Sequence, residues 1–303
     1  MSDRVARPLA RRLAALGPAL LLLVLPALAR AQDSEEFAPQ NEFRLDPWVP
    51  IDVFGIDLSI TKGVLYLVLA GAATCGTMVW IAGRMQAKPN RVQTAVEAAY
   101  DLTANTITRQ NMDSTMAKRW FPFIATLFFF IWFSNMIGYL PLPTNTEHPA
   151  FDLFGIPIPS FAIYAATANL SIPLALALVV WLSYHIEGIR AKGLVRYVKG
   201  WVPSGVSGPV VFLVAPIEVI SQMVRLISLS ARLFANMLAG HMLILIMAGG
   251  MAVLLGSAIV GVATLPIGVA FYIFEVGLVA SLQAFIFALL ASIYLGEAVA
   301  EEH

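Results

Sequence analysis

The sequence is poor in charge: only 13% of its 303 residues are charged, whereas 59% are hydrophobic. Soluble domains carry roughly 25% charged residues, so this composition argues against a soluble domain. The formal net charge is zero, which gives no general attraction to nucleic acid. The single cysteine, Cys75, excludes an intramolecular disulfide.

Several sequence patterns are also missing. We find no series of ~10-residue segments with alternating hydrophobicity, which a transmembrane barrel would show. There is no internal repeat, no phosphate-binding glycine loop, no metal-ligand cluster and no nucleophile constellation. These absences argue against a barrel and against a chain that is itself a catalyst.

What the sequence contains is long apolar runs, several of which exceed the ~20 residues that span a bilayer as a helix. Helices satisfy their backbone polar groups within lipid, so we expect an all-α polytopic membrane protein with five membrane passages. The expected passages are residues 63–82, 120–140, 161–184, 210–255 and 257–294. Helices of about 40 residues are ~60 Å long, twice the hydrocarbon thickness, so the last two must be steeply inclined or bent.

Charge in the loops predicts the orientation of the chain. Residues 32–60 are strongly acidic, whereas the loops after the first and third passages are basic and should be cytoplasmic. The N-terminus is then outside and the C-terminus inside. Within the first basic loop, residues 90–112 show apolar residues at helical spacing, which predicts an amphipathic helix on the cytoplasmic membrane surface. An ordinary solvated loop helix is the alternative.

The first 31 residues have the pattern of a secretory signal peptide. A basic stretch with four arginines precedes an apolar run over residues 13–28, and Ala29-Arg30-Ala31 fits the cleavage rule. An uncleaved first membrane helix is the alternative. In both cases residues 32–62 form an exported acidic segment, and residues 63–303 form the membrane domain.

Arg232 lies inside the fourth apolar run. A charge at membrane depth costs about 2.5–3.5 kcal/mol on insertion scales, so it needs a partner or a function. At about 100° per residue, six polar residues of this run fall on one side of the helix. They are Glu218, Ser221, Arg225, Ser228, Arg232 and Asn236. Such a stripe lines water or faces a partner; polar contacts between helices explain the serines and Asn236 but not the arginine.

The last apolar run carries a second polar stripe with Tyr272, Gln283, Tyr294 and Glu297. On the same wheel Glu275 lies about 80° from this stripe, and His241 lies about 180° from Arg232. We therefore expect neither His241 nor Glu275 to face Arg232. Two roles remain open for a His241–Glu275 pair between the helices. One is a separate proton-binding site, since imidazole titrates near neutrality, and the other is a structural hydrogen bond.

Residues 228–241 (SLSARLFANMLAGH) closely resemble the signature of subunit a of F-type ATP synthases, and so do residues 282–287 (LQAFIF). The similarity extends to residues 133–138 and 216–221, and to Pro89, Gln93 and Glu97. It covers about residues 45–303 and leaves out the exported N-terminus.

The resemblance implies the proton-channel subunit of the F0 sector, with two half-channels that lead to the carboxylates of a rotating c-ring. Arg232 would be the separating charge, with Glu218 in the cytoplasmic half-channel and Asn236, His241, Glu275 and Gln283 in the outer one. Further channel-lining residues would be Asn135, Asn169, Ser221 and Ser228. The implied partners are the c-ring, the subunit b stalk, the lipid bilayer and, indirectly, the F1 sector. The implied location is a bacterial inner membrane. No cofactor or metal is implied, and the chain would have no catalytic role within the complex.

This sequence departs from the family pattern at two positions. Asn169 stands where many relatives have an aspartate, and Glu275 precedes Gln283 by eight residues where seven are expected. A sodium-coupled version of the same subunit remains an alternative. A stand-alone secondary transporter would show a repeat of its spans, which is missing here. A structural subunit without transport is the third alternative.

Overall fold

The computed structural model describes residues 43–45, 47–53, 56–57, 59–84, 89–153, 156–201, 208–247, 251, 255 and 257–300. The predicted signal peptide, much of the exported segment and the last three residues lie outside the described residues. The chain divides into two compact units. One contains Met242–Ile273, and the other contains Glu42–His241 together with Phe274–His303.

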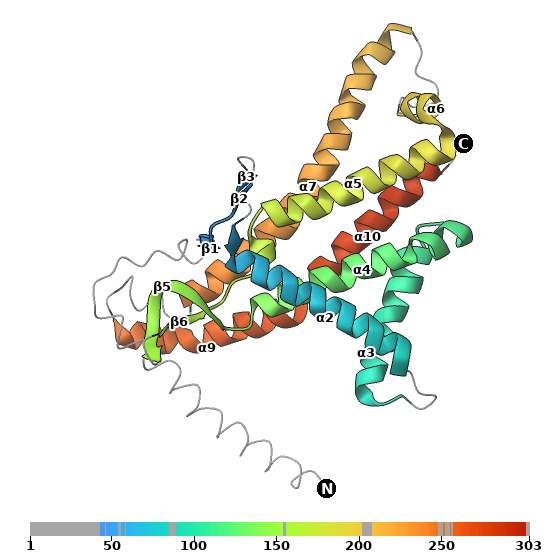
Figure 1. Cartoon of the computed structure of the whole chain (residues 1–303). Coiled ribbons are helices and arrows are strands. Elements are labelled where there is room, and N and C mark those ends of the chain that lie inside the picture. Colours follow the sequence, from blue (N-terminus) through green and yellow to red (C-terminus); the bar gives the residue numbers. More distant parts are fainter. Residues whose placement is uncertain are drawn as a thin grey trace. The chain divides into compact units, whose positions relative to one another are not determined.

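Helices dominate the described chain (Figure 1). Five helical segments are long and apolar enough to cross a membrane: Lys62–Ile81, Ser114–Gly138, Ser171–Lys192, Val211–Leu245 and Ile259–Val299. The all-α polytopic fold with five passages is therefore confirmed. How steeply the last two passages incline in a bilayer stays a prediction.

Helices α2 and α4 form the first two passages. Helix α2 (Lys62–Arg84) follows two short antiparallel pairs, β1 (Pro47–Val49) with β4 (Ile60–Thr61) and β2 (Asp52–Val53) with β3 (Ile56–Asp57). Helix α4 (Ser114–Gly138) begins earlier than the predicted residue 120. The reason is a cap: the Asp113 carboxylate accepts hydrogen bonds from the backbone N–H groups of Thr115 (3.0 Å) and Met116 (3.3 Å).

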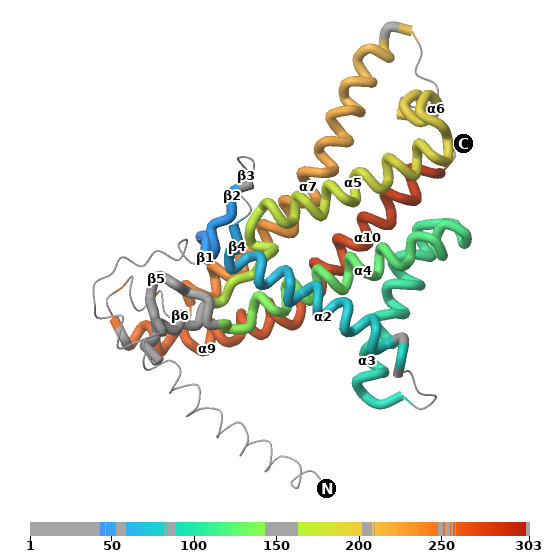
Figure 2. The backbone as a smooth tube through the Cα atoms, viewed as in Figure 1, coloured from blue at the N-terminus to red at the C-terminus, as the bar shows by residue number. Residues whose placement is uncertain are grey.

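The predicted amphipathic segment is helical. It consists of α3 (Arg91–Asp101) and the π-helical η2 (Leu102–Arg109), and Asn90 caps it by accepting from the Gln93 N–H at 2.8 Å. The backbone then turns at residues 110–113 to begin α4 (Figure 2). The position of this helix on the cytoplasmic membrane surface stays a prediction.

The prediction of a third passage over residues 161–184 was wrong at its start. Strands β5 (Leu142–Leu153) and β6 (Ile156–Ala162) form an antiparallel hairpin, a 3-10 turn η3 (Ala166–Ala168) follows, and α5 covers Ser171–Lys192. The apolar residues after Ser160 belong to β6 and to a buried turn, so hydropathy alone placed the helix too early. The short α6 (Leu194–Lys199) follows α5.

The last elements are α7 (Val211–Leu245), which follows the 3-10 turn η4 (Gly208–Val210), then α9 (Ala258–Phe274), the π-helical η6 (Glu275–Val279) and α10 (Ala280–Val299). Pro216 lies inside α7 without ending it. Helix α7 ends at Leu245, ten residues before residue 255, where the fourth passage was predicted to end.

Helix α10 packs against both α4 and α5, and α4 also packs against α2 (Figure 1). A line of small residues on α10 makes this close approach possible: Ala280, Ala284, Ala288, Ala291 and Ser292 are all buried. Polar contacts fix the register. Trp132 Nε1 donates to Ser281 Oγ at 3.1 Å, and Asn135 Nδ2 donates to the Ala280 carbonyl at 3.1 Å. These contacts hold the polar residues described next in fixed positions.

Candidate functional site

Arg232 lies on the exposed side of α7. The buried side of the helix carries Leu229, Leu233 and Met237, whereas Arg232 and Asn236 are exposed. Among the described residues, none forms a hydrogen bond or an ion pair with Arg232. The chain therefore packs α7 by its apolar side and presents the guanidinium outward, where another molecule can reach it.

A first polar group, the Glu218 cluster, lies along the N-terminal half of α7. Its members are Glu218, Gln222 and Arg225 of α7, Tyr184 of α5, and Tyr294 and Glu297 of α10. Gln222 connects it, because its Nε2 donates to Glu218 Oε1 at 3.0 Å and its Oε1 accepts from the Tyr184 hydroxyl at 3.0 Å. Gln222 itself is only 7% exposed.

Arg225 joins α7 to α10 within the same cluster. Its Nη1 lies 2.7 Å from Glu297 Oε2, and its guanidinium lies 5.0 Å from the centre of the Tyr294 ring. The pair is partly exposed, with 32% and 54% of the two side chains accessible. A surface ion pair contributes little to stability. This pair also lines a cavity, so it affects how water reaches that cavity.

A cavity of about 280 Å³ opens among the residues of the Glu218 cluster. Water occupies about 30 Å³ per molecule in the liquid, so the cavity has room for several waters. Its wall also includes Lys192 at the end of α5 and Tyr197 of α6. Burial raises the pKa of the Tyr197 hydroxyl, which therefore stays protonated and contacts Nδ1 of His185 at 2.7 Å.

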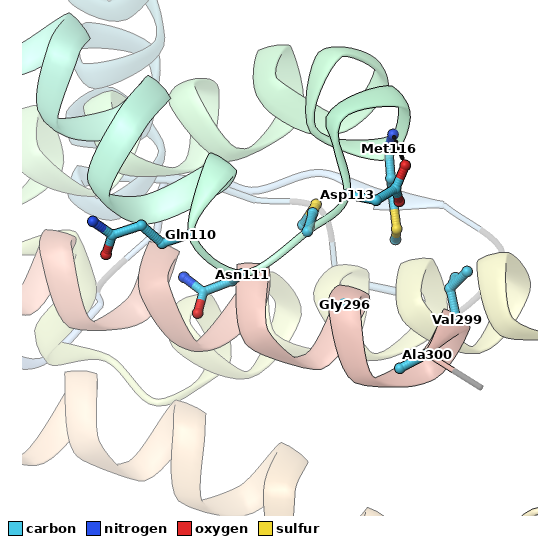
Figure 3. Close-up of a pocket in the computed structure, with 8 residues that line it drawn as sticks. Gln110, Asn111, Asp113, Met116, Gly296, Val299 and Ala300 are labelled. Atoms are coloured by element: carbon cyan, nitrogen blue, oxygen red, sulfur yellow. Dashed lines mark hydrogen bonds between the residues drawn. The ribbon is translucent and has the colours of Figure 1, made fainter. Parts of the chain in front are cut away.

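A second cavity, of about 380 Å³, lies between the turn after η2 and the end of α10 (Figure 3). Gln110 and Asn111 line one side, and Gly296 and Val299 line the other. Among the described residues that line it, the one carboxylate is that of Asp113, which already caps α4. This cavity contains no member of the Glu218 cluster, so we assign it no part in the site.

A further polar group, the His241 cluster, consists of Tyr139, His241 and Glu275. The Tyr139 hydroxyl donates to Glu275 Oε2 at 3.1 Å, and the Tyr139 ring stacks on the His241 ring with centroids 4.5 Å apart. The two ring nitrogens of His241 contact the carbonyl oxygens of Met237 (2.9 Å) and Gly138 (3.1 Å). A direct His241–Glu275 hydrogen bond, considered from the sequence, is not found among the described residues.

The π turn η6 affects where Glu275 lies. Its bounds are Glu275–Val279, directly before the helix that carries Gln283. A π turn holds one more residue than an α turn, so it absorbs one residue of rotation. This matches the unexpected eight-residue spacing between Glu275 and Gln283. The wheel value of about 80° assumed a regular α-helix, so it does not apply across this π turn.

The other predicted site residues occupy varied positions. Asn135 is fully buried and also accepts from Thr167 Oγ1 at 2.8 Å, so its amide ties α4 to α10 and to η3. Gln283 is buried on α10. Asn169 lies just before α5 and accepts from the Ser171 N–H at 3.1 Å. On α7, Ser221 is half-buried and Ser228 is exposed.

The sequence reasoning missed three members of these clusters: Tyr139, Tyr184 and Gln222. Gln222 follows Glu218 by four residues and precedes Arg225 by three, so its helical spacing was an available signal. The two tyrosines gave no such signal. They join the clusters through tertiary contacts across α4, α5 and η6, which no local pattern reveals.

Together the fold and the site define a multi-pass helical membrane protein with ionisable groups inside its spans. Residues 64–296 match the family described as ATP synthase A chain. The ATP synthase subunit a of Maricaulis maris is 34% identical over 270 residues, which cover 88% of this chain and 98% of the relative. That of Parvibaculum lavamentivorans is 36% identical over 270 residues, which cover 88% and 94%. The chain therefore belongs to the ATP synthase subunit a family, and the family resemblance is confirmed.

Proposed function

We propose that this chain is the proton-translocating subunit of the membrane sector of a bacterial F-type ATP synthase. Its role is vectorial: it leads protons through two half-channels to and from carboxylates on a rotating c-ring. Family membership supports the general role. The observation that carries the specific proposal is the exposed, unpartnered Arg232, located on α7 between two polar clusters of the described chain.

The spacing along α7 supports two separate paths. At 1.5 Å per residue, Glu218 lies about 21 Å before Arg232 along the helix axis, and His241 lies about 14 Å after it. The two clusters are thus about 35 Å apart, which is comparable with the ~30 Å hydrocarbon thickness. Each cluster belongs to one half-channel: Glu218 and Ser221 to one, and Asn236, His241, Glu275 and Gln283 to the other.

Arg232 performs two tasks in this proposal. An opposite charge within ~4–6 Å favours the ionised form of a carboxylate, so a ring carboxylate that passes Arg232 releases its proton. At an effective dielectric of ~20 the pair attracts by about 4 kcal/mol at 4 Å. The fixed positive charge also repels protons and so blocks a leak between the paths. A guanidinium suits this task because it does not deprotonate in proteins.

The charge of the loops assigns a side to each cluster. The Glu218 cluster adjoins Lys192 and the basic α6, which by the positive-inside rule supports a position at the cytoplasmic side. The His241 cluster then serves the outer half-channel, with the N-terminus outside and the C-terminus inside. The c-ring contacts the exposed side of α7. The subunit b stalk, and through it the catalytic head, complete the assembly.

The test is Arg232→Ala in the intact complex, measured in inverted membrane vesicles. We expect the loss of ATP synthesis and of ATP-driven proton pumping, while the complex still assembles. Arg196→Ala, which removes an exposed cation of α6, is the matched control and should leave both activities intact. Wild-type synthesis by the Arg232→Ala complex would refute the proposal. Pumping that requires added sodium would establish the sodium-coupled alternative instead.

A further inference from the structure

Tyr139 touches both titratable groups of the His241 cluster at once. Its hydroxyl donates to Glu275 Oε2 at 3.1 Å, and its ring stacks on His241 with an interplanar angle of 28°. Tyr139 and His241 are each only 1% exposed. No pattern in the sequence assigns Tyr139 a role, and it lies just beyond the end of α4, far in sequence from both of its partners.

The backbone around Tyr139 leaves the cluster little freedom. A side chain at Gly138 would place its Cβ 2.7 Å from the Ala165 Cα, so only glycine fits where η3 approaches α4. The same glycine provides the carbonyl that contacts His241 Nε2. Across the cluster, Gly240 of α7 leaves the space that the Glu275 carboxylate occupies. These two close approaches fix α4, α7 and η6 around Tyr139.

The ring nitrogens of His241 show why a connecting residue is needed. Nδ1 and Nε2 both face backbone carbonyls, so neither is available to bond the Glu275 carboxylate in this arrangement. A neutral imidazole donates from only one ring nitrogen and so bonds one of these carbonyls, whereas a cationic imidazole donates from both and bonds the two of them. The connection between His241 and Glu275 therefore runs through the stacked ring and the hydroxyl of Tyr139.

We propose that Tyr139 is the positioning residue of the outer half-channel, holding the His241 ring and the Glu275 carboxylate in a fixed mutual arrangement for proton exchange. This inference rests on the proposed function. The hydroxyl orients the carboxylate, and the ring holds the imidazole. Both contacts are lost if the residue becomes aliphatic, whereas phenylalanine removes the hydroxyl alone.

The variant that tests this inference is Tyr139→Phe in the intact complex, reconstituted in liposomes. A hydrogen bond to a charged group is strong enough that its loss should lower ATP-driven proton pumping about tenfold. Tyr139→Leu, which also removes the stacked ring, should lower pumping further. The control is Tyr100→Phe: Tyr100 is exposed on α3 and its ring packs on Phe121, a contact that phenylalanine keeps. Pumping by this control should equal wild type.

Infrared difference spectroscopy separates positioning from a merely structural role. The carbonyl stretching band of protonated Glu275 is identified by its absence in Glu275→Gln. Without the Tyr139 hydroxyl as a donor, this band should move to higher frequency in Tyr139→Phe. An unchanged band, or wild-type pumping by Tyr139→Phe, would overturn the inference. If Arg232→Ala still abolishes pumping in that case, the proposed function survives the failure of this inference.

Discussion

The Glu218 cluster and the His241 cluster, which α7 connects, differ in how much room they leave for water. The Glu218 cluster surrounds a cavity of about 280 Å³, and its ion pair between Arg225 and Glu297 is partly exposed. The His241 cluster is tightly packed: Tyr139 and His241 are almost fully buried, and His241 is held between two carbonyl oxygens. Under the proposed function, we expect water to carry protons in the first region and the protein's own groups to do so in the second.

The largest expected effect is on proton pumping, when one carboxylate in each region is replaced by an amide. Glu275→Gln should lower ATP-driven proton pumping about 100-fold, because the half-buried Glu275 carboxylate contacts the almost fully buried Tyr139, where water has little room to replace a proton-transfer group. Glu218→Gln should lower it at most about fivefold, because water bridges can replace the lost group in the cavity. Fluorescence quenching of a pH-sensitive dye in inverted vesicles measures both rates. Equal losses would show that the two regions do not differ in their use of water.

An intermediate effect is expected from overfilling the packed region. Gly138→Ala forces a methyl group against the backbone of Ala165 and should destabilise the protein by about 1–3 kcal/mol. The thermal unfolding midpoint of the purified complex measures this. At Gly71, in α2, an added Cβ meets nothing within 4 Å, so Gly71→Ala is the matched control. Equal midpoints for the two variants would contradict the tight packing described around Tyr139.

The smallest effect is expected at the exposed ion pair of the open region. Glu297→Gln removes the 2.7 Å partner of Arg225. An exposed pair contributes at most about 1 kcal/mol, so stability should change by less than that. Pumping rates should stay within about twofold of wild type, because solvent takes the place of the lost carboxylate. A tenfold loss would show that this pair controls access to the cavity.

Hydropathy located all five membrane passages, because the cost of exposing polar backbone to lipid leaves a strong signal in composition. It failed at the start of α5. Residues 161–168 are as apolar as a span, yet they form the end of β6, a short connection and the buried turn η3. A period-based pattern cannot distinguish a buried turn from a helix when both are apolar.

Only part of the candidate site could be predicted from the sequence. The exposed polar side of α7, with Arg232 and Asn236, follows directly from helical spacing. The connection through Tyr139 does not, because it joins residues more than a hundred positions apart. The wheel value for Glu275 assumed a regular α-helix, whereas the π turn η6 changes the rotation per residue.

Access from the two sides of the membrane tests the central claim most directly. In a Cys75→Ser background, which removes the single, exposed cysteine, Ser221→Cys and Asn236→Cys place thiols on either side of Arg232. A membrane-impermeant thiol reagent is then applied to vesicles of either orientation. If Arg232 separates two half-channels, the Ser221→Cys variant should react only from the cytoplasmic side. The Asn236→Cys variant should then react only from the outside. Reaction of both positions from the same side would contradict the account.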